Sequence, residues 1–425
     1  MRMLHIGDLH FHRDHYDEAR ASIETILGEH DRKPFDLFVI PGDIWDGPVQ
    51  NSAGSRFKDF LDLIRRLADR APVAISYGTP SHDTDGSLEV FESLQAKYDI
   101  RILRPGKAYF LGNDGDIMES DGEGDQYGRI VLFGVPEPNK KWLLANAGAS
   151  GKDETDASVR QAMRNLFLGL GGLRREYPDL PCVLLYHGQV SGARSGTGFK
   201  VEGGSGLAVS KDGLAAVGAD YYALNDIHEP QQIPDLPAYY PGSIYPLNWG
   251  ETHKAGANVV EIEESAGDLF ASTTGGTLVS RLDFPHPVRS KISLKASDPF
   301  PESASGLVWV EITATADEAK SFDTDVLTSR LVGHGALPGS RVTLCVIPTE
   351  TVRAGEISEK KTLREKVQVW ADNSSLTIPE SVLEKADELE REASARGASE
   401  TGAYIRMTRL RLRGAKGRGQ NHGLH

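Results

Sequence analysis

The chain has 425 residues, of which 39% are hydrophobic and 25% are charged, a composition typical of globular proteins. Its length predicts two or three domains rather than one. The formal net charge of −14 excludes a protein that coats nucleic acid through its overall charge, but not a nuclease, because bound divalent metal ions supply positive charge locally.

The two cysteines, Cys182 and Cys345, lie in apolar runs, which predicts buried free thiols. Two cysteines exclude a disulfide framework and a zinc site built on cysteine ligands. The sequence contains no apolar stretch of membrane-spanning length and no signal-peptide pattern. We therefore expect a soluble, cytoplasmic protein that makes no membrane contact.

The first part of the chain alternates between short apolar runs and amphipathic segments. Strands are predicted at residues 3–6, 37–40 and 72–75, and helices at residues 16–30 and 56–70. In the second helix, apolar residues recur every three or four positions, which predicts one buried face. The order of strands and helices favours a largely parallel sheet with right-handed crossovers.

The middle of the chain continues this pattern with longer connections. Apolar runs at 108–111 and 130–135 flank a Gly- and Asp-rich stretch, which predicts an exposed hairpin loop. A helix at 158–177 and strands at 181–186, 221–224 and 258–262 follow. The glycine-rich segment 192–206 has no periodicity and is expected to form a loop near the functional site.

The composition changes near residue 285. A strand at 308–312, a helix at 323–332 and a strand at 341–347 predict a small α+β module, and helices are expected at 360–370 and 379–396. Charged residues within 406–418 are all basic. The predicted domains are therefore 1–284, 285–355, and 356–425 with its basic tail.

Five short apolar runs are each followed by Asp or His. These strand ends carry Asp8 and His10, Asp43 and Asp46, His82 and Asp83, His187, and finally Asp226 and His228. Each alone is more often a turn, a helix cap or a core histidine. Because the carboxyl ends of parallel strands meet at one edge of a sheet, their joint occurrence predicts a metal site.

Carboxylates and imidazoles suit Mn, Fe, Zn or Mg. One ion could be held by Asp8, His10 and His228, and a second by His187, Asp226 and a residue near Ser81. Asp43 could bridge them, since two ions roughly 3.5–4 Å apart stabilise both the attacking and the leaving oxygen of a phosphoryl displacement.

Three more polar residues could have roles in the reaction other than binding metal. His82 could donate a hydrogen bond to the phosphoryl oxygens or protonate the leaving group. Asp83 or Asp46 could orient the metal ligands. We therefore expect His82 and Asp83 to serve catalysis without binding metal themselves.

The order of these motifs resembles that of the calcineurin-like metallophosphoesterases. Within them, residues 220–224, the segment 240–244, Gly250-Glu251 and Lys254 resemble the SbcD-type nuclease subunits, which work with an SbcC-type ATPase in DNA double-strand-break repair. The motif resemblance covers about residues 1–265. It implies an α/β fold, namely a calcineurin-like β-sandwich with flanking helices, followed by a small α+β capping domain and C-terminal helices.

The resemblance also implies function and partners. It points to a metal-dependent DNA exonuclease and endonuclease with two divalent ions, preferably Mn²⁺, with Mg²⁺, Fe or Zn as alternatives. It implies DNA as substrate, the ATPase as partner and a homodimer. Apart from two positions, the family's metal and catalytic residues match Asp8, His10, Asp43, His82, His187 and His228 unchanged.

Two positions depart from the family pattern. Ser81 stands where the family has Asn, and Asp226 stands where it has the first His of its last motif. Both changes fall on the second metal site. Asp is a competent hard ligand, whereas Ser is a poorer ligand than an Asn carbonyl.

Several alternatives remain open. The chain could be another dinuclear phosphodiesterase, acting on a small phosphodiester or a phosphoprotein, or a non-catalytic scaffold that positions the ATPase on DNA. The apolar stripe within residues 378–389 could dock a partner helix or pack on the protein's own core. The helix at 56–70 could dimerise or belong to the core. The basic tail could touch phosphates.

Overall fold

The computed structural model describes residues 1–120, 128–138, 152–194, 208–251, 253–263, 276–347, 357, 359–374 and 376–396. The chain divides into two compact units. One unit comprises Met1–Ile312 with Asp323–Leu344, and the other comprises Thr313–Phe322 with the described residues from Cys345 onward. The predicted three-part division of the chain stays a prediction.

Two mixed β-sheets form the larger unit's main body. The first has six strands in the order β13-β12-β1-β2-β3-β4. Its strands are β1 (Arg2–His5), β2 (Leu37–Pro41), β3 (Val73–Ser76), β4 (Ile100–Leu103), β12 (Gly256–Ile262) and β13 (Thr277–Asp283). Strands β1 to β4 run parallel, as the sequence predicts, and β12 closes the sheet by pairing antiparallel with β1.

The second sheet has seven strands in the order β10-β11-β9-β8-β7-β5-β6. They are β5 (Tyr109–Gly112), β6 (Ile117–Glu119), β7 (Gly128–Val135), β8 (Cys182–His187), β9 (Tyr221–Asn225), β10 (Gln231–Ile233) and β11 (Ala238–Tyr240). Strands β7, β8 and β9 are parallel. The expected β5–β7 antiparallel pair is present, but its connection also contains the short strand β6, which the sequence analysis missed.

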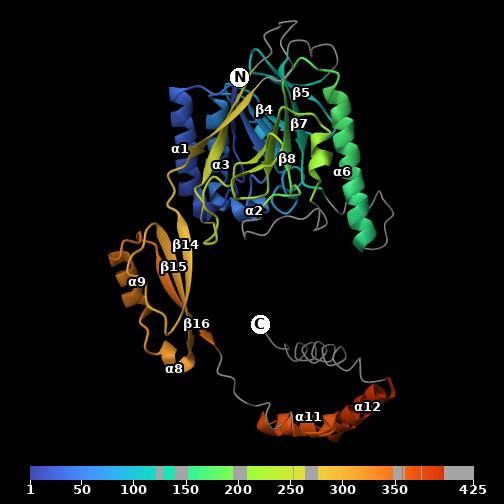
Figure 1. Cartoon of the computed structure of the whole chain (residues 1–425), viewed down its shortest axis with the longest axis vertical. Helices are drawn as coiled ribbons and strands as arrows, with labels where there is room; N and C mark the ends of the chain where they lie inside the picture. Colours follow the sequence, from blue (N-terminus) through green and yellow to red (C-terminus); the bar gives the residue numbers. More distant parts are fainter. Residues whose placement is uncertain are drawn as a thin grey trace, which may run out of the picture. The chain divides into compact units, whose positions relative to one another are not determined.

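The two sheets face each other and carry helices on their outer sides (Figure 1). Side chains of both sheets, such as Val39 and Leu185, share a central core. Helices α1 (Tyr16–Arg32) and α3 (Phe57–Ala68) cover the first sheet, and α6 (Lys152–Arg174) covers the second. The predicted β-sandwich with flanking helices is therefore confirmed.

The apolar face of α3 belongs to this domain's own core. Phe60, Leu63, Ile64 and Leu67 are all buried against the first sheet. The short helices in the same body are α2 (Val49–Ser52), α4 (Glu89–Glu92) and α7 (Lys211–Ala215), with 3-10 turns at Arg13–His15 and Gly54–Arg56.

A three-stranded sheet in the order β14-β15-β16 follows the sandwich in sequence. Its strands are β14 (Arg289–Lys295), β15 (Leu307–Thr315) and β16 (Arg341–Ile347), with helices α8 (Ala316–Ala319) and α9 (Thr324–Gly333) in the connection. Alternate residues of β15, such as Val308 and Val310, are buried. Cys345 is exposed, so its predicted burial is wrong, because β16 is an edge strand with one solvent face.

Two helices end the described chain, α11 (Leu363–Asn373) and α12 (Glu380–Arg396). Thr362 and Glu365 form a capping box at the start of α11, which fixes that terminus. Leu383 and Ala386 of α12 are buried, and Arg364 forms an ion pair with Asp387 over 2.9 Å. Part of the predicted apolar stripe thus packs within the helical pair.

Some sequence predictions fall outside the described residues. These are most of the glycine-rich segment 192–206 and the basic run 406–418. Among the helices that the structure describes, none has both the length and the apolar character required to cross a membrane.

Candidate metal centre

Strand ends from both sheets deliver the predicted polar residues to one place. Asp8 and His10 follow β1, Asp43 follows β2, His187 ends β8, and Asp226 and His228 follow β9. His187 Nε2 lies 3.3 Å from Asp43 Oδ1, although the two residues belong to different sheets. The parallel strands therefore bring their carboxyl ends together, as the sequence pattern predicts.

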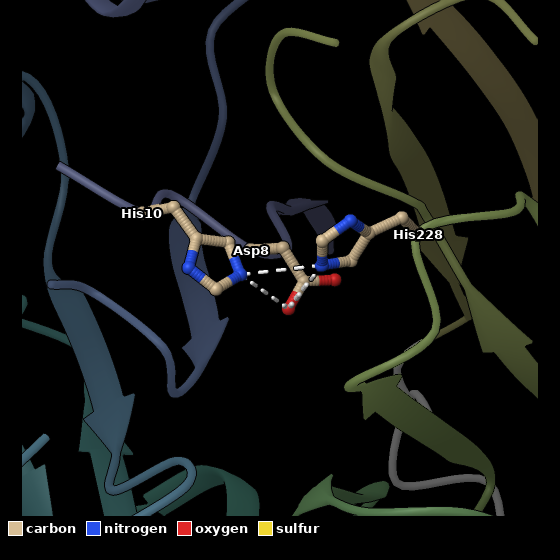
Figure 2. Close-up of side chains that lie close together, drawn as sticks. All are labelled: Asp8, His10 and His228. Atoms are coloured by element: carbon tan, nitrogen blue, oxygen red, sulfur yellow. Dashed lines mark hydrogen bonds and ion pairs between the residues drawn. The ribbon is translucent and has the colours of Figure 1, made fainter. Parts of the chain in front are cut away.

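Figure 2 shows a first group made of Asp8, His10 and His228. The two imidazole Nε2 atoms lie 3.2 Å apart, and Asp8 Oδ1 lies 3.8 Å from His10 Nε2 and 4.0 Å from His228 Nε2. Asp8 is buried, and neither of its carboxylate oxygens has a hydrogen-bond partner among the described residues. A buried carboxylate without a partner is costly, so this donor set fits a divalent cation.

Carboxylates orient both imidazoles of this group. Glu251 Oε1 accepts a hydrogen bond from His228 Nδ1 over 2.8 Å, and Asp46 Oδ1 lies 3.4 Å from His10 Nδ1. Each ring therefore turns its Nε2 inward, as is usual for histidine that binds metal. Burial lowers the pKa of His228, but the charges of Asp8 and Glu251 outweigh it and raise that pKa to about 9.

A second group surrounds Asp43, which is itself shared with the first. Asp43 Oδ2 lies 3.8 Å from His10 Nε2, while Asp43 Oδ1 faces His187 Nε2. His187 Nδ1 donates to the carbonyl of Pro41 over 2.7 Å, which leaves Nε2 directed at Asp43. Asp226 Oδ1 lies 4.0 Å from the same Nε2. Asp43 thus lies between the two groups, where a bridging ligand is required.

Charge is concentrated in this second group. Burial disfavours the ionised form of Asp43, but the neighbouring His187 outweighs burial and lowers the pKa of Asp43. Burial lowers the pKa of His187, yet the charge of Asp43 holds it well above its usual value. Burial raises the pKa of Asp226. A cation at this place would satisfy all three groups.

Thr79 contacts two residues of the second group. The backbone N–H of Thr79 donates to Asp43 Oδ1 over 2.6 Å, and its hydroxyl lies 3.3 Å from Asp43 Oδ2 and 3.1 Å from His187 Nε2. Ser81 is exposed, and none of the described contacts of Asp43 and His187 comes from it. Ser81 as a ligand stays a prediction, while the turn after β3 places the Thr79 hydroxyl, two residues earlier, against this group.

Backbone strain is concentrated at the same residues. Among the described residues, five that are not glycine have positive φ, and four of these are Asp8 (40°), His10 (40°), Asp43 (49°) and Asp226 (103°). Such conformations cost of order 1–3 kcal/mol each and cluster at functional sites. The strand-end turns are thus held in unfavourable geometry that directs these side chains into one cluster.

Two glycines let the Asp43 turn and the Thr79 turn touch. A Cβ on Gly42, which has a φ of 87°, would lie 2.3 Å from the Cα of Gly78. A Cβ on Gly78 would lie 2.2 Å from Asp43 Oδ1. Glycine at both positions is therefore what allows the Thr79 N–H to reach Asp43.

His82 and Asp83 have different surroundings. His82 is half-buried, and its ring packs edge-on against His10 with centroids 4.8 Å apart, in a group that also includes Asp46. Asp83 is buried and accepts hydrogen bonds from the backbone N–H groups of Gly78, Ile44 and Trp45. Asp83 is thus a positioning residue that ties the two turns together.

The buried position of Asp83 shifts its pKa. Burial, with the charge of Asp43 second, raises the pKa of Asp83 to about 7. The backbone N–H groups that donate hydrogen bonds to Asp83 lower its pKa, because they stabilise the carboxylate.

Glu251, Asn225 and Thr79 were not predicted from the sequence to support the metal ligands. Glu251 follows no apolar run, so strand-end reasoning could not find it. Asn225 ends β9, and its Nδ2 donates to the Gly42 carbonyl over 3.0 Å, which joins the turns of the two sheets. Its place directly before Asp226 is the signal that could have revealed it.

Comparison with known families agrees with this geometry. Residues 1–159 match the model of the calcineurin-like phosphoesterases. That family typically binds two divalent metal ions, and the matched stretch includes Asp8, His10, Asp43 and His82. Comparison with curated proteins gives no significant match. The match over residues 1–159 therefore supports a calcineurin-like phosphoesterase domain, a type of domain that hydrolyses phosphoesters with the help of metal ions.

Proposed function

We propose that this protein is an SbcD-type nuclease subunit, which hydrolyses DNA phosphodiester bonds and works with an SbcC-type ATPase in double-strand-break repair. The observation that carries the hydrolytic part is the position of Asp43 between two groups of imidazole and carboxylate ligands. A carboxylate in this position suits two divalent ions that share it, and Mn²⁺ is the ion we expect.

Each group of side chains would hold one ion. Asp8, His10 and His228 would bind the first, and His187, Asp226 and Thr79 the second, with Asp43 common to both. When bound, such ions acidify a water molecule and stabilise negative charge on the phosphate. The chain's own residues orient the ligands, chiefly through Glu251 and through the Pro41 carbonyl.

His82 is the residue best placed to act on the substrate rather than on metal. It is half-buried beside His10, so part of the residue remains accessible. An imidazole there can donate a hydrogen bond to a phosphoryl oxygen or a proton to the leaving oxygen. Asp46, which lies in the same group, can hold that ring in its orientation.

The segment after β11 supports the SbcD-type assignment over other phosphodiesterases. In this segment Ser243 Oγ lies 3.3 Å from Glu251 Oε2, so the Tyr-Pro-Gly-Ser-Ile and Gly-Glu motifs that carry the resemblance meet beside the metal cluster. A Cβ on Gly242 would lie 2.4 Å from the His228 carbonyl, which explains the glycine in the motif.

The C-terminal helices support an ATPase partner. Trp370 of α11 and Val382 of α12 are 50% and 44% exposed, although other apolar residues of this pair are buried. Exposed aromatic and aliphatic side chains on a helical pair suit an amphipathic partner helix. We propose that this surface binds the ATPase and that the protein acts as a homodimer.

One experiment separates this function from its alternatives. Hydrolysis of end-labelled duplex DNA and of bis-p-nitrophenyl phosphate should be measured with Mn²⁺, with Mg²⁺ and after metal removal. We expect Mn²⁺-dependent cleavage of both substrates. Cleavage of the small substrate alone would favour a different phosphodiesterase, and failure to cleave either would favour a non-catalytic scaffold.

A further inference from the structure

One face of the β14–β15–β16 sheet is rich in positive charge. This face, called the outer face below, carries the charged and aromatic side chains of Arg289, Lys291, Lys295, Trp309, Glu311 and Arg341. Lys291, Lys295 and Arg341 are exposed, whereas the alternate residues Val308 and Val310 are buried on the opposite face. Four cations and one carboxylate thus lie together on a chain whose net charge is −14.

Two tryptophans contact three of these four cations. The Lys291 ammonium lies 4.0 Å and the Arg341 guanidinium 4.2 Å from the centre of the Trp309 ring. The Trp309 Nε1 donates to Thr343 Oγ1 over 2.7 Å, which fixes that ring. The cationic side chains therefore lose little freedom when they bind an anion, because they are already ordered.

Trp249 extends this face toward the metal cluster. Its ring lies edge-on to Trp309 with centroids 6.1 Å apart, and Arg341 and Arg289 lie 5.3 Å and 6.0 Å from its centre. Trp249 is two residues before Glu251, the carboxylate that orients His228. The same loop thus carries one end of the cationic face and one support of the candidate metal centre.

Three of the four cations on this face form no ion pair with any described carboxylate. Lys291 pairs with Glu311 over 3.1 Å, but no ion pair among the described residues involves Arg289, Lys295 or Arg341. Surface cations elsewhere, such as Arg32 and Lys107, have carboxylate partners. The outer face therefore has positive charge to offer to an external polyanion.

We propose that this outer face binds the phosphate backbone of nucleic acid and leads the strand toward the metal centre. Arg and Lys side chains neutralise successive phosphates, and cations interleaved with aromatic rings are typical of surfaces that follow a nucleic-acid strand. The choice of nucleic acid among polyanions rests on the proposed function. The positive charge and the order of the face are observed independently of that function.

The test compares two charge-matched double variants of the full-length protein. Arg341→Gln with Lys295→Gln removes two cations from the face, and Arg32→Gln with Lys107→Gln removes two cations elsewhere. Fluorescence anisotropy with labelled single-stranded and duplex oligonucleotides, in EDTA to prevent cleavage, gives the affinity at several salt concentrations. Turnover of bis-p-nitrophenyl phosphate with Mn²⁺ checks the metal centre separately.

We expect the face variant to bind DNA about tenfold or more weakly, and its log–log salt slope to decrease by about two, since each lost phosphate contact reduces the slope by roughly one. The control variant should bind like the wild type, and both should turn over the small substrate normally. Equal binding by the two variants would overturn the inference. Wild-type DNA binding that depends on the face, without any hydrolysis, would refute the proposed function but support the inference.

Discussion

Thr79 donates its backbone N–H to Asp43 Oδ1 over 2.6 Å and places its hydroxyl 3.1 Å from His187 Nε2. One residue thus contacts both candidate ligands that link the two sheets. Because the hydroxyl lies between a carboxylate and an imidazole, we propose Thr79 as a further ligand of the second ion.

The first prediction follows from this contact. Thr79→Val keeps the shape and the backbone N–H but removes the hydroxyl, so it should weaken the second Mn²⁺ by about tenfold or more while leaving the first nearly unchanged. Electron paramagnetic resonance of Mn²⁺ titrations measures both affinities. Ser81→Ala is the control and should titrate like the wild type. A loss in Ser81→Ala that exceeds the loss in Thr79→Val would restore the original assignment.

Asp226 gives the second prediction. Its carboxylate lies 4.0 Å from His187 Nε2, and burial raises its pKa. Asp226→Ala should weaken the second ion and spare the first, whereas Asp226→His should retain binding with a changed preference among Mn²⁺, Mg²⁺ and Zn²⁺. Isothermal titration calorimetry with each metal gives the comparison. A wild-type titration for Asp226→Ala would show that Asp226 is not a ligand.

The third prediction concerns the first ion. Glu251 accepts the hydrogen bond of His228 Nδ1 over 2.8 Å. Glu251→Gln keeps the size of the side chain but removes its charge, so affinity for the first ion should fall by roughly 10–100-fold, as for other carboxylates that orient a metal-binding histidine. The same Mn²⁺ titration applies. Weaker binding of the second ion instead would mean that the ligands are assigned to the wrong ions.

Strand-end reasoning found the residues whose position depends only on where an apolar run stops. Asp8, Asp43 and His187 each follow or end a buried parallel strand, and the structure brings them together. Whether Thr79 or Ser81 faces the second group depends on the conformation of a turn. The alternation of apolar and polar residues along strands does not specify that conformation. Glu251 follows no strand, and Cys345 lies on an edge strand whose apolar composition hides its exposed face.

The fourth prediction uses a buried histidine outside the metal cluster. Burial lowers the pKa of His5 to about 3, and its Nδ1 lies 2.9 Å from the Tyr221 hydroxyl. Because the folded pKa lies below the unfolded value of about 6.5, the unfolded chain takes up the proton first. Stability should therefore fall as pH decreases from 6.5 toward 3, by up to about 1.4 kcal/mol per pH unit from this group.

His5→Gln provides the comparison, since an amide can keep the hydrogen bond to Tyr221 but does not titrate. Urea unfolding in EDTA at pH 7 and pH 5 should show a smaller acid loss of stability in the variant than in the wild type. Equal losses would show that His5 does not control acid sensitivity. The difference in stability between the variant and the wild type at pH 7 measures the effect of the substitution on packing, separately from its effect on acid sensitivity.

The fifth prediction concerns the partner. Deletion of residues 357–396 removes α11 and α12, which contribute no described residue to the metal cluster. Turnover of bis-p-nitrophenyl phosphate should persist, whereas co-purification with a co-expressed SbcC-type ATPase should be lost. Undiminished co-purification would place the ATPase contact elsewhere and leave the helical pair as a self-contained element.

If two metal ions share Asp43, then Asp43→Asn should weaken the binding of both. Asparagine tolerates the positive φ of 49° at this position and removes only the charge, so the turn should survive. We expect Mn²⁺ titration by electron paramagnetic resonance to show that both ions bind more weakly, unlike the single-ion effects of Thr79→Val and Glu251→Gln. Weakening of only one ion, or of neither, would contradict the sharing of Asp43.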